Sequence, residues 1–509
     1  MSTPQDKLAQ SLAVLKKLQD EGVVAIHTNN ITRTHRERLV NNGFIKEVIK
    51  GWYIPTRPDE PAGESTAWFA SFWGFCADYL NSRFSNQWCL SPEQSLSIHS
   101  GNWNVPVQLL VRSPKGGNKP IFLLHETSIM DVRLKLPDKQ DIETKDNIQI
   151  MTLAAALVSC TPGYYSNNPV ESRAALHMIS DASEILYKLL KGGHSTIAGR
   201  IAGAFRNIGK NAIADNIIGA MKAAGYKVVE KDPFGEKAAI IFNERELSPY
   251  VNRMRMTWAD MRTIVLENFP RSPTLRQNTH EYLRHVDEIY LTDAYHSLSI
   301  EGYRVSEDLI DRVRKGSWDP ELNRKDKEYS NALVARGYWQ AFQAVKESLA
   351  KILNGDSAGK VAKKDHSIWY RELFAPSVSA GIIAASDLAG YRNQPVYIRR
   401  SMHVPPRYEA VRDLMPAFFT LFKEEEEPAV RAVLGHFLFV YIHPYNDGNG
   451  RMGRFLMNVM LASGSYPWTV IPLDARNDYM AALEEASVRR NIEPFAKFID
   501  RLVQKGMKQ

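Results

Sequence analysis

Residues 443–454 read HPYNDGNGRMGR, and no other stretch of the 509-residue chain says as much about its fold and chemistry. The stretch combines an imidazole at His443, a carboxylate at Asp447, glycines and two guanidiniums. A neutral imidazole can accept a proton from a hydroxyl near neutral pH. One or two carboxylates and several waters are the usual ligands of Mg²⁺ on nucleotide phosphates. Because packing alone asks for no such combination, we interpret the stretch as a phosphate-handling site.

The glycines of this stretch indicate a loop that leads into a helix. Gly448 and Gly450 allow backbone angles that turn N–H groups toward an anion. Residues 451–461 are rich in Met, Leu and Val, which predicts a helix, and a helix N-terminus attracts anions. Arg451 and Arg454 are three positions apart, so they lie on neighbouring parts of one helix face and can fork onto phosphate oxygens.

The whole string resembles the signature of the Fic family, His-Pro-Phe-x-Asp/Glu-Gly-Asn-Gly-Arg-x-x-Arg. Every fixed position agrees except that Tyr445 stands where Phe is usual, a swap that keeps the ring and adds a hydroxyl. The alternative is an ordinary loop-to-helix junction with incidental charges, but about nine positions are specified, which is far more than a lone glycine pattern. The resemblance implies transfer of AMP from ATP to a Ser, Thr or Tyr hydroxyl of a protein, which could be the chain itself.

The resemblance also implies a role for each residue of the string. His443 would be the base that deprotonates the acceptor hydroxyl, and Asp447 would hold Mg²⁺ against the α- and β-phosphates. The remaining residues would contact phosphate: Asn449 at the α-phosphate, the amides of Gly448 and Gly450 around the anion, Arg451 at the β-phosphate and Arg454 at the γ-phosphate. Some relatives transfer other groups or remove AMP, so a de-AMPylase that uses the same site is an alternative.

A second motif lies upstream, in a predicted helix near residues 290–303. Residues 297–302, SLSIEG, resemble the family's inhibitory motif, Ser/Thr-x-x-x-Glu-Gly/Asn. Ser297 and Glu301 are four apart and share one helix face. The resemblance implies that the Glu301 carboxylate pairs with Arg454 and occupies the fork meant for the γ-phosphate. The alternative is a solvated helix with a capping serine.

Residues 390–406 lie between these two motifs and resemble the Fic flap, a hairpin that holds a target segment by strand addition. Val396, Tyr397 and Ile398 alternate in the pattern of a strand, and paired prolines then end any ladder. A plain surface hairpin is the alternative. The resemblance makes this segment the predicted docking site for a protein substrate.

Residues 1–57 have the pattern of a winged helix-turn-helix. Apolar spacing predicts helices over residues 8–19 and 32–42, and residues 44–54 read as two strands that turn at Lys50-Gly51. The basic second helix could enter a major groove while the hairpin meets phosphates. The candidate DNA contacts are Arg33, Arg36, Arg38, Lys46 and Lys50. A solvated basic helix beside a structural hairpin is the alternative, because charge and periodicity do not prove DNA binding.

Residues 5–240 resemble AbiEi-type antitoxin regulators, which pair a winged helix with an α/β domain. The likeness rests on GWYIP at residues 51–55 and on a helical pattern over residues 153–205. It makes a DNA-binding regulator or antitoxin, whose Fic part senses nucleotide, the alternative function. The implied domains are 1–57 (winged helix-turn-helix), 58–245 (α/β module) and 250–509 (Fic domain), with a strand predicted over residues 238–242 before the second boundary.

Length and composition set the outer limits. A chain of 509 residues is long enough for about three domains, and 44% apolar with 24% charged residues is ordinary for a globular protein. The polar N-terminus lacks a signal region, no apolar run could span a bilayer, and three cysteines suggest neither a disulfide framework nor a zinc site. We therefore expect a cytoplasmic protein with no membrane partner. We also expect the protein to be bacterial. A net charge of +7 permits DNA contact, and helix faces outside the site could supply a homodimer interface.

The fold class that we expect is multidomain α+β: an N-terminal winged helix-turn-helix and α/β module, followed by an all-α Fic domain with a β-hairpin flap. The helix predicted over residues 476–490 borders the nucleoside in the family, so Asn477 and Tyr479 could touch adenosine, although Tyr479 could equally be a core ring. An exposed loop is expected at residues 360–364. The other helices predicted in this domain span residues 257–269, 278–297, 307–314, 326–350, 365–374, 408–424, 429–442 and 450–462.

Overall fold

The computed structural model describes residues 3–61, 63–238, 248–273, 278–318 and 327–508, which fall into two compact units. The first unit is Met1–Arg253 together with Tyr397–Val404, and the second is Met254–Val396 together with Pro405–Gln509. Most of the strand predicted over residues 238–242, and the first part of the boundary predicted at 245–250, fall on residues 239–247, outside the described residues.

Two helices and a small sheet open the first unit. Thr3 and Asp6 cap the first helix reciprocally, and Thr32 caps the second. Gly51, at φ 83°, makes the tight turn between the last two strands, where a side chain would be strained. The sheet is antiparallel in the order β1-β3-β2. The two helices and the hairpin predicted here are confirmed: α1 (Pro4–Asp20), β1 (Ile26–His27), α2 (Arg33–Asn41), β2 (Ile45–Ile49) and β3 (Trp52–Pro55).

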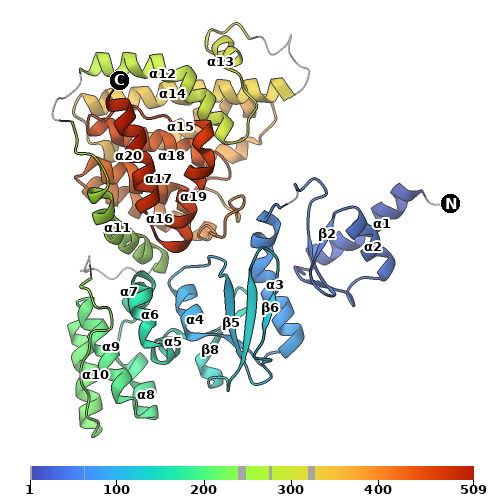
Figure 1. Ribbon diagram of the computed structural model, residues 1–509, viewed down its shortest axis with the longest axis vertical. Coiled ribbons are helices and arrows are strands. Elements are labelled where there is room, and N and C mark those ends of the chain that lie inside the picture. Colours follow the sequence, from blue (N-terminus) through green and yellow to red (C-terminus); the bar gives the residue numbers. More distant parts are fainter. Residues whose placement is uncertain (1–2, 62, 239–247, 274–277, 319–326, 509) are drawn as a thin grey trace. The chain divides into compact units, whose positions relative to one another are not determined.

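The rest of the first unit is built around α3 and a four-stranded sheet, both visible in Figure 1. Trp68, Phe72 and Phe75 of α3 are buried in one core with Leu109 and Ile129 of the sheet. The strand order is β4-β5-β7-β6, with β5 and β7 parallel and the other pairs antiparallel. The elements are α3 (Thr66–Phe84), β4 (Cys89–Leu90), α4 (Pro92–His99), β5 (Gln108–Ser113), β6 (Pro120–Phe122), β7 (Ser128–Arg133), β8 (Ile142–Lys145), β9 (Ile148–Met151), α5 (Leu153–Ser159), α6 (Pro162–Asn167), α7 (Pro169–Met178), α8 (Ser183–Gly192), α9 (Ser195–Asn207) and α10 (Asn211–Ala223).

The described residues of the second unit form helices and no strand. α17 and α18 pack side by side (Figure 1), and nearly every side chain of α18 is buried. Residues 455–462 of α18 are apolar except for Asn458, and a helix segment that is apolar on nearly all sides belongs inside a protein. The helices are α11 (Pro249–Glu267), which crosses the unit boundary, α12 (Thr279–Ile300), α13 (Glu307–Arg314), α14 (Lys327–Leu353), α15 (Ala358–Ser379), α16 (Tyr408–Glu424), α17 (Pro428–Ile442), α18 (Asn449–Ser463), α19 (Arg476–Arg489) and α20 (Glu493–Met507).

Two predictions for this part of the chain are wrong. The exposed loop expected at residues 360–364 lies inside α15, because Ala358, Val361 and Ala362 bury an apolar side that the charged neighbours obscure in the sequence. The β-hairpin expected at residues 396–398 is not formed, since residues 395–406 are all described and contain no strand. The three prolines of that segment have no N–H to donate to a ladder.

None of the helices in the described residues has both the length and the apolar composition that a bilayer span requires.

Candidate active site

His443 ends α17 in a left-handed conformation, with φ 52°. Its Nδ1 lies 3.0 Å from the carbonyl oxygen of Val440. A ring nitrogen that faces a carbonyl must carry the proton, so in the neutral ring Nε2 is the atom that can accept one. Burial lowers the pKa of His443, against the opposing effect of the Val440 carbonyl. The imidazole is therefore neutral, and ready to act as a base, at neutral pH.

Arg392 holds the loop that carries His443. Its buried guanidinium donates to the carbonyl oxygens of His443 at 2.7 Å and Gln394 at 3.1 Å, and also to that of Pro406. Its backbone N–H donates to the carbonyl of Pro444 at 2.9 Å. Burial lowers the pKa of Arg392 to about 10, so it stays charged. This arginine ties both ends of the predicted flap to the histidine loop.

The glycine loop begins α18. Gly448 has φ 80°, and a Cβ there would press on the Phe374 ring at 2.8 Å, so no other residue fits without strain. The buried amide of Asn449 makes two bonds to Tyr445: Nδ2 donates to its carbonyl at 2.8 Å, and Oδ1 accepts from its N–H at 2.9 Å. Asn449 thus closes the loop, and its predicted contact with the α-phosphate stays a prediction. Tyr445 stacks on Tyr370, with ring centroids 3.7 Å apart.

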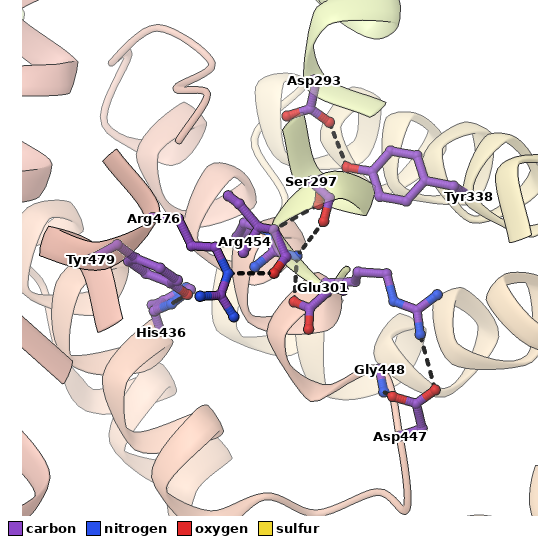
Figure 2. Close-up of polar contacts among 12 residues, drawn as sticks. Asp293, Ser297, Glu301, Tyr338, His436, Asp447, Gly448, Arg454, Arg476 and Tyr479 are labelled. Atoms are coloured by element: carbon purple, nitrogen blue, oxygen red, sulfur yellow. Dashed lines mark hydrogen bonds and ion pairs between the residues drawn. The ribbon is translucent and has the colours of Figure 1, made fainter. Parts of the chain in front are cut away.

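Asp447 is the exposed carboxylate of the site, with 63% of its side chain accessible. It accepts from the N–H of Gly448 at 2.6 Å and from Arg451 Nη2 at 3.3 Å (Figure 2). The described residues hold no cluster of three or more metal-ligating side chains. A single accessible carboxylate suits Mg²⁺ that is bound mainly through nucleotide phosphates and waters, and does not suit a metal held by the protein alone.

Arg454 meets the upstream motif at the other end of the site, as Figure 2 shows. Its Nε donates to Ser297 Oγ at 2.9 Å, and its Nη2 donates to the Ser297 carbonyl at 3.0 Å and to Glu301 Oε1 at 2.7 Å. Nη1, which carries two N–H groups, is buried and makes no hydrogen bond within the described residues. The structure places the Glu301 carboxylate on Arg454, as the resemblance implied, and the Nη1 group is left for another acceptor.

The Glu301 carboxylate is ionised in this position. Burial would raise its pKa, but the positive charges of Arg454 and Arg451 outweigh burial and lower it. Its Oε1 lies so close to Gly450 that a Cβ on that glycine would collide with it. The carboxylate thus sits on the start of α18, where the helix dipole also favours negative charge.

Arg451 is almost fully buried between two aromatic rings. Its guanidinium carbon lies 5.2 Å from the centroid of Tyr303 and 5.0 Å from that of Phe374. Its Nε is buried, with no acceptor in the described part of the chain. The two rings fix the guanidinium in place, and a buried donor without a partner is a group that a bound anion could satisfy.

The end of α12 is fixed by bonds on two sides, which keeps Ser297 and Glu301 in register with α18. Buried Asp293 accepts from Tyr338 Oη at 2.6 Å and from Trp468 Nε1 at 3.1 Å. At the C-terminus of the helix, Arg476 Nε donates to the Ile300 carbonyl at 2.8 Å (Figure 2). These bonds therefore hold the end of α12, and with it the Glu301 carboxylate, in place beside α18.

Part of the chain is similar to known proteins. Residues 366–461 match the Fic/DOC family model. The chain contains a Fic domain. A Nematostella vectensis protein named protein adenylyltransferase Fic is 39% identical over 119 residues, which is 23% of this chain and 27% of that protein. The Caenorhabditis elegans protein adenylyltransferase fic-1 is 30% identical over 110 residues, 21% of this chain and 22% of that protein. The chain thus matches about a quarter of the length of these curated relatives.

Solved structures that resemble the chain are also Fic proteins. A Fic domain-containing signalling protein from Bacteroides thetaiotaomicron is 16% identical, with a TM-score of 0.35, over 50% of this chain and 94% of that one. The structure of C. elegans Fic-1 is 17% identical, with a TM-score of 0.38, over 63% of this chain and 90% of that one.

The two residues predicted at the nucleoside differ in exposure within the second unit. Asn477 is exposed near the start of α19. Tyr479 is 1% exposed, and its hydroxyl is bonded to His436 at 2.8 Å (Figure 2). Burial raises the pKa of Tyr479 to about 12 and lowers that of His436 to about 3, so both are neutral. Tyr479 is therefore the core ring that the sequence left open, and an adenosine contact by it would require the pair to move.

The predicted flap residues do not all lie in the unit that holds the rest of the site. Val396 belongs to the second unit, whereas Tyr397 and Ile398 belong to the first. Tyr397 is 44% exposed. Sequence reasoning could not foresee this division, because the partners of the segment lie some 300 residues upstream, as in the bond between Arg400 and Thr66.

The side chains predicted to contact DNA differ in the contacts that they make within the protein. Arg33 pairs with Glu37 at 2.6 Å on α2, and Arg36 lies over the Tyr53 ring at 6.0 Å. Arg38 donates to the Lys7 carbonyl at 2.6 Å and to Ser11 Oγ at 2.9 Å, so it holds the two helices together. The other two candidates, Lys46 and Lys50, are exposed on the β2–β3 hairpin.

Three residues of the site were missed from the sequence: Arg392, Tyr303 and Phe374. The signal for Tyr303 was its position directly after the inhibitory motif, and Phe374 carried none. Arg392 was visible only as a charge in the flap segment, because its partners are carbonyl oxygens, which every residue has.

Proposed function

We propose that the chain transfers AMP from ATP to a Ser, Thr or Tyr hydroxyl of a protein, and that Glu301 restrains this transfer. The observation that carries the proposal is the placement of Arg454: it is buried at the start of α18 and bonded to Ser297 and Glu301, and its Nη1 makes no hydrogen bond within the described residues. The names of the curated relatives, protein adenylyltransferase Fic and fic-1, support the same reaction.

His443 is the proposed base. Its Nε2 takes the proton of the acceptor hydroxyl while that oxygen bonds to the α-phosphorus of ATP. The bond between the α-phosphorus and the bridging oxygen of the β-phosphate breaks, and pyrophosphate leaves with the bonding pair. The lowered pKa of His443 keeps Nε2 unprotonated at neutral pH, as this role requires.

The phosphates would bind at the start of α18. The amides that follow Gly448 point along the helix axis toward the anion, Arg451 would meet the β-phosphate, and Arg454 the γ-phosphate. The buried N–H groups of both arginines that lack acceptors in the described residues support these roles. Mg²⁺ held by Asp447 would neutralise charge on the departing pyrophosphate.

Glu301 would restrain the enzyme by occupying the γ-phosphate position. Its carboxylate already bonds to Arg454 Nη2 and lies against Gly450. Because it is ionised, it also repels an incoming triphosphate. ATP would bind productively only when this carboxylate moves away.

The test compares ATP labelled on the α-phosphate with ATP labelled on the γ-phosphate. Transfer of AMP puts the α-label on protein and leaves the γ-label in pyrophosphate, whereas a kinase does the reverse. His443→Ala should abolish labelling while nucleotide binding persists. Equal labelling by the His443→Ala protein would reject the base. Loss of AMP from a pre-modified protein, without transfer from ATP, would favour a de-AMPylase.

We also propose DNA binding by the N-terminal region, where the two helices and the hairpin predicted from the sequence are formed. On the β2–β3 hairpin, Lys46 is exposed near the start of β2 and Lys50 is exposed at the turn, and both would meet phosphates if the hairpin acts as a wing. The test is retention of random duplex DNA at low salt, with binding that weakens as salt rises. No retention at low salt would remove this part of the proposal.

A further inference from the structure

The predicted flap changes unit in its middle. Residues 397–404 pack as part of the first unit, whereas the chain on either side of them, through Val396 and from Pro405, belongs to the second. Met402 and Val404 lie against the core of α3 and the four-stranded sheet. The segment is thus held by a part of the chain that lies outside the Fic domain.

Glu64 is the polar anchor of this segment. Only 5% of its side chain is exposed, and its Oε2 accepts from Arg399 Nε at 2.8 Å and from Arg400 Nε at 3.3 Å. Its Oε1 accepts from Thr66 Oγ1 at 2.6 Å, and Thr66 Oγ1 in turn accepts the N–H of Arg400 at 3.0 Å. Burial would raise the pKa of Glu64, but these hydrogen bonds and the Arg399 charge lower it to about 2. The carboxylate is therefore charged and fully engaged at neutral pH.

Backbone contacts extend the anchor along the segment. The N–H of Val105 donates to the Met402 carbonyl at 2.9 Å, and buried His403 is bonded to Asn104 at 2.8 Å. By contrast, among the described residues no backbone hydrogen bond engages Val396 or Tyr397. One part of the segment is fixed, and the adjoining residues 396–397 keep free backbone groups that an added strand could pair with.

We propose that Glu64 is a positioning residue for protein-substrate docking: by holding residues 399–400 it keeps the neighbouring backbone extended for an incoming peptide. The proposal rests on the function proposed above. Fixing the segment before binding removes part of the ordering cost of docking, so loss of the anchor should weaken acceptor binding and leave nucleotide binding unchanged.

Hydrogen exchange of the full chain tests the anchor without any activity. Glu64→Gln should speed exchange in peptides covering residues 397–404 by roughly tenfold, because charge-assisted bonds are lost. Trypsin should also cut faster after Arg399 and Arg400. Glu60→Gln is the matched control, and should change neither. Should Glu64→Gln disturb folding, Arg399→Gln with Arg400→Gln removes the same bonds from exposed side chains. Unchanged exchange in both variants would overturn the proposal.

A kinetic arm tests docking in a Glu301→Gly background, with α-labelled ATP and the His443→Ala chain as protein acceptor. Glu64→Gln should raise KM for the acceptor roughly tenfold, with KM for ATP unchanged, and Glu64→Asp should restore part of the loss. Faster exchange with an unchanged acceptor KM would overturn the docking role. A parent that transfers no AMP would reject the proposed function and the docking role with it, while exchange would still decide whether Glu64 holds the segment.

Discussion

Replacement of Glu301 by Gly should activate the enzyme by an amount that the structure sets. The carboxylate makes one short charged hydrogen bond to Arg454, at 2.7 Å, with 27% of its side chain exposed. Hydrogen bonds to charged groups contribute about 1.5–3 kcal/mol. Since 1.4 kcal/mol corresponds to a factor of ten, removal of this competitor should raise the rate of AMP transfer about 10- to 150-fold at subsaturating ATP.

The assay is the initial rate of incorporation of α-labelled ATP into protein. Glu301→Gln should activate less than Glu301→Gly, because the amide keeps its bulk over Gly450 but loses its charge. Glu281→Gly, at an exposed position near the start of the same helix, serves as control and should leave the rate unchanged. If all three variants transfer AMP at the wild-type rate, the ion pair does not restrain the enzyme and the reasoning is refuted.

The other predictions concern His443, the Arg392 side chain that holds its loop, and the β2–β3 hairpin. Arg392→Lys should lower kcat roughly tenfold or more with little change in ATP affinity, because Lys cannot bond several carbonyls at once. A lower ATP affinity with normal kcat would argue against a role of Arg392 in positioning His443. Burial puts the pKa of His443 below the usual value of about 6.5, so the acid limb of the transfer rate should have its midpoint below that pH, and a midpoint above 7 would contradict the assignment. Lys46→Glu with Lys50→Glu should weaken DNA retention and flatten its salt dependence in a filter-binding titration; unchanged retention would exclude the hairpin as a contact.

Much of the helical fold could be predicted from the sequence. The bounds predicted for α13 and α16, residues 307–314 and 408–424, agree with the structure, because acidic residues begin each helix and apolar residues recur at helical spacing. The helix α15 was cut short because Lys360, Lys363 and Lys364 dominate its start, although they are simply its solvent face. Charge density misled here, since it looks the same in a loop and on an exposed helix face.

Some residues of the site could be predicted from the sequence and others could not. The chemistry of His443, Asp447 and the two arginines could be predicted, because a local loop-to-helix string fixes their spacing. Arg392 and Glu64 could not, since each acts on groups distant in the chain: Arg392 on carbonyl oxygens of two loops, and Glu64 on arginines more than 300 positions away. Strand periodicity at residues 396–398 predicted a ladder, but an extended segment forms a strand only if a partner strand is present.

Intact-protein mass spectrometry tests the central claim most directly. The Glu301→Gly chain is incubated with ATP and Mg²⁺ beside the same chain that also carries His443→Ala. The account predicts that the first gains the mass of one or more AMP groups and the second gains none. A mass gain of phosphate in place of AMP, or equal AMP addition to both chains, would contradict it.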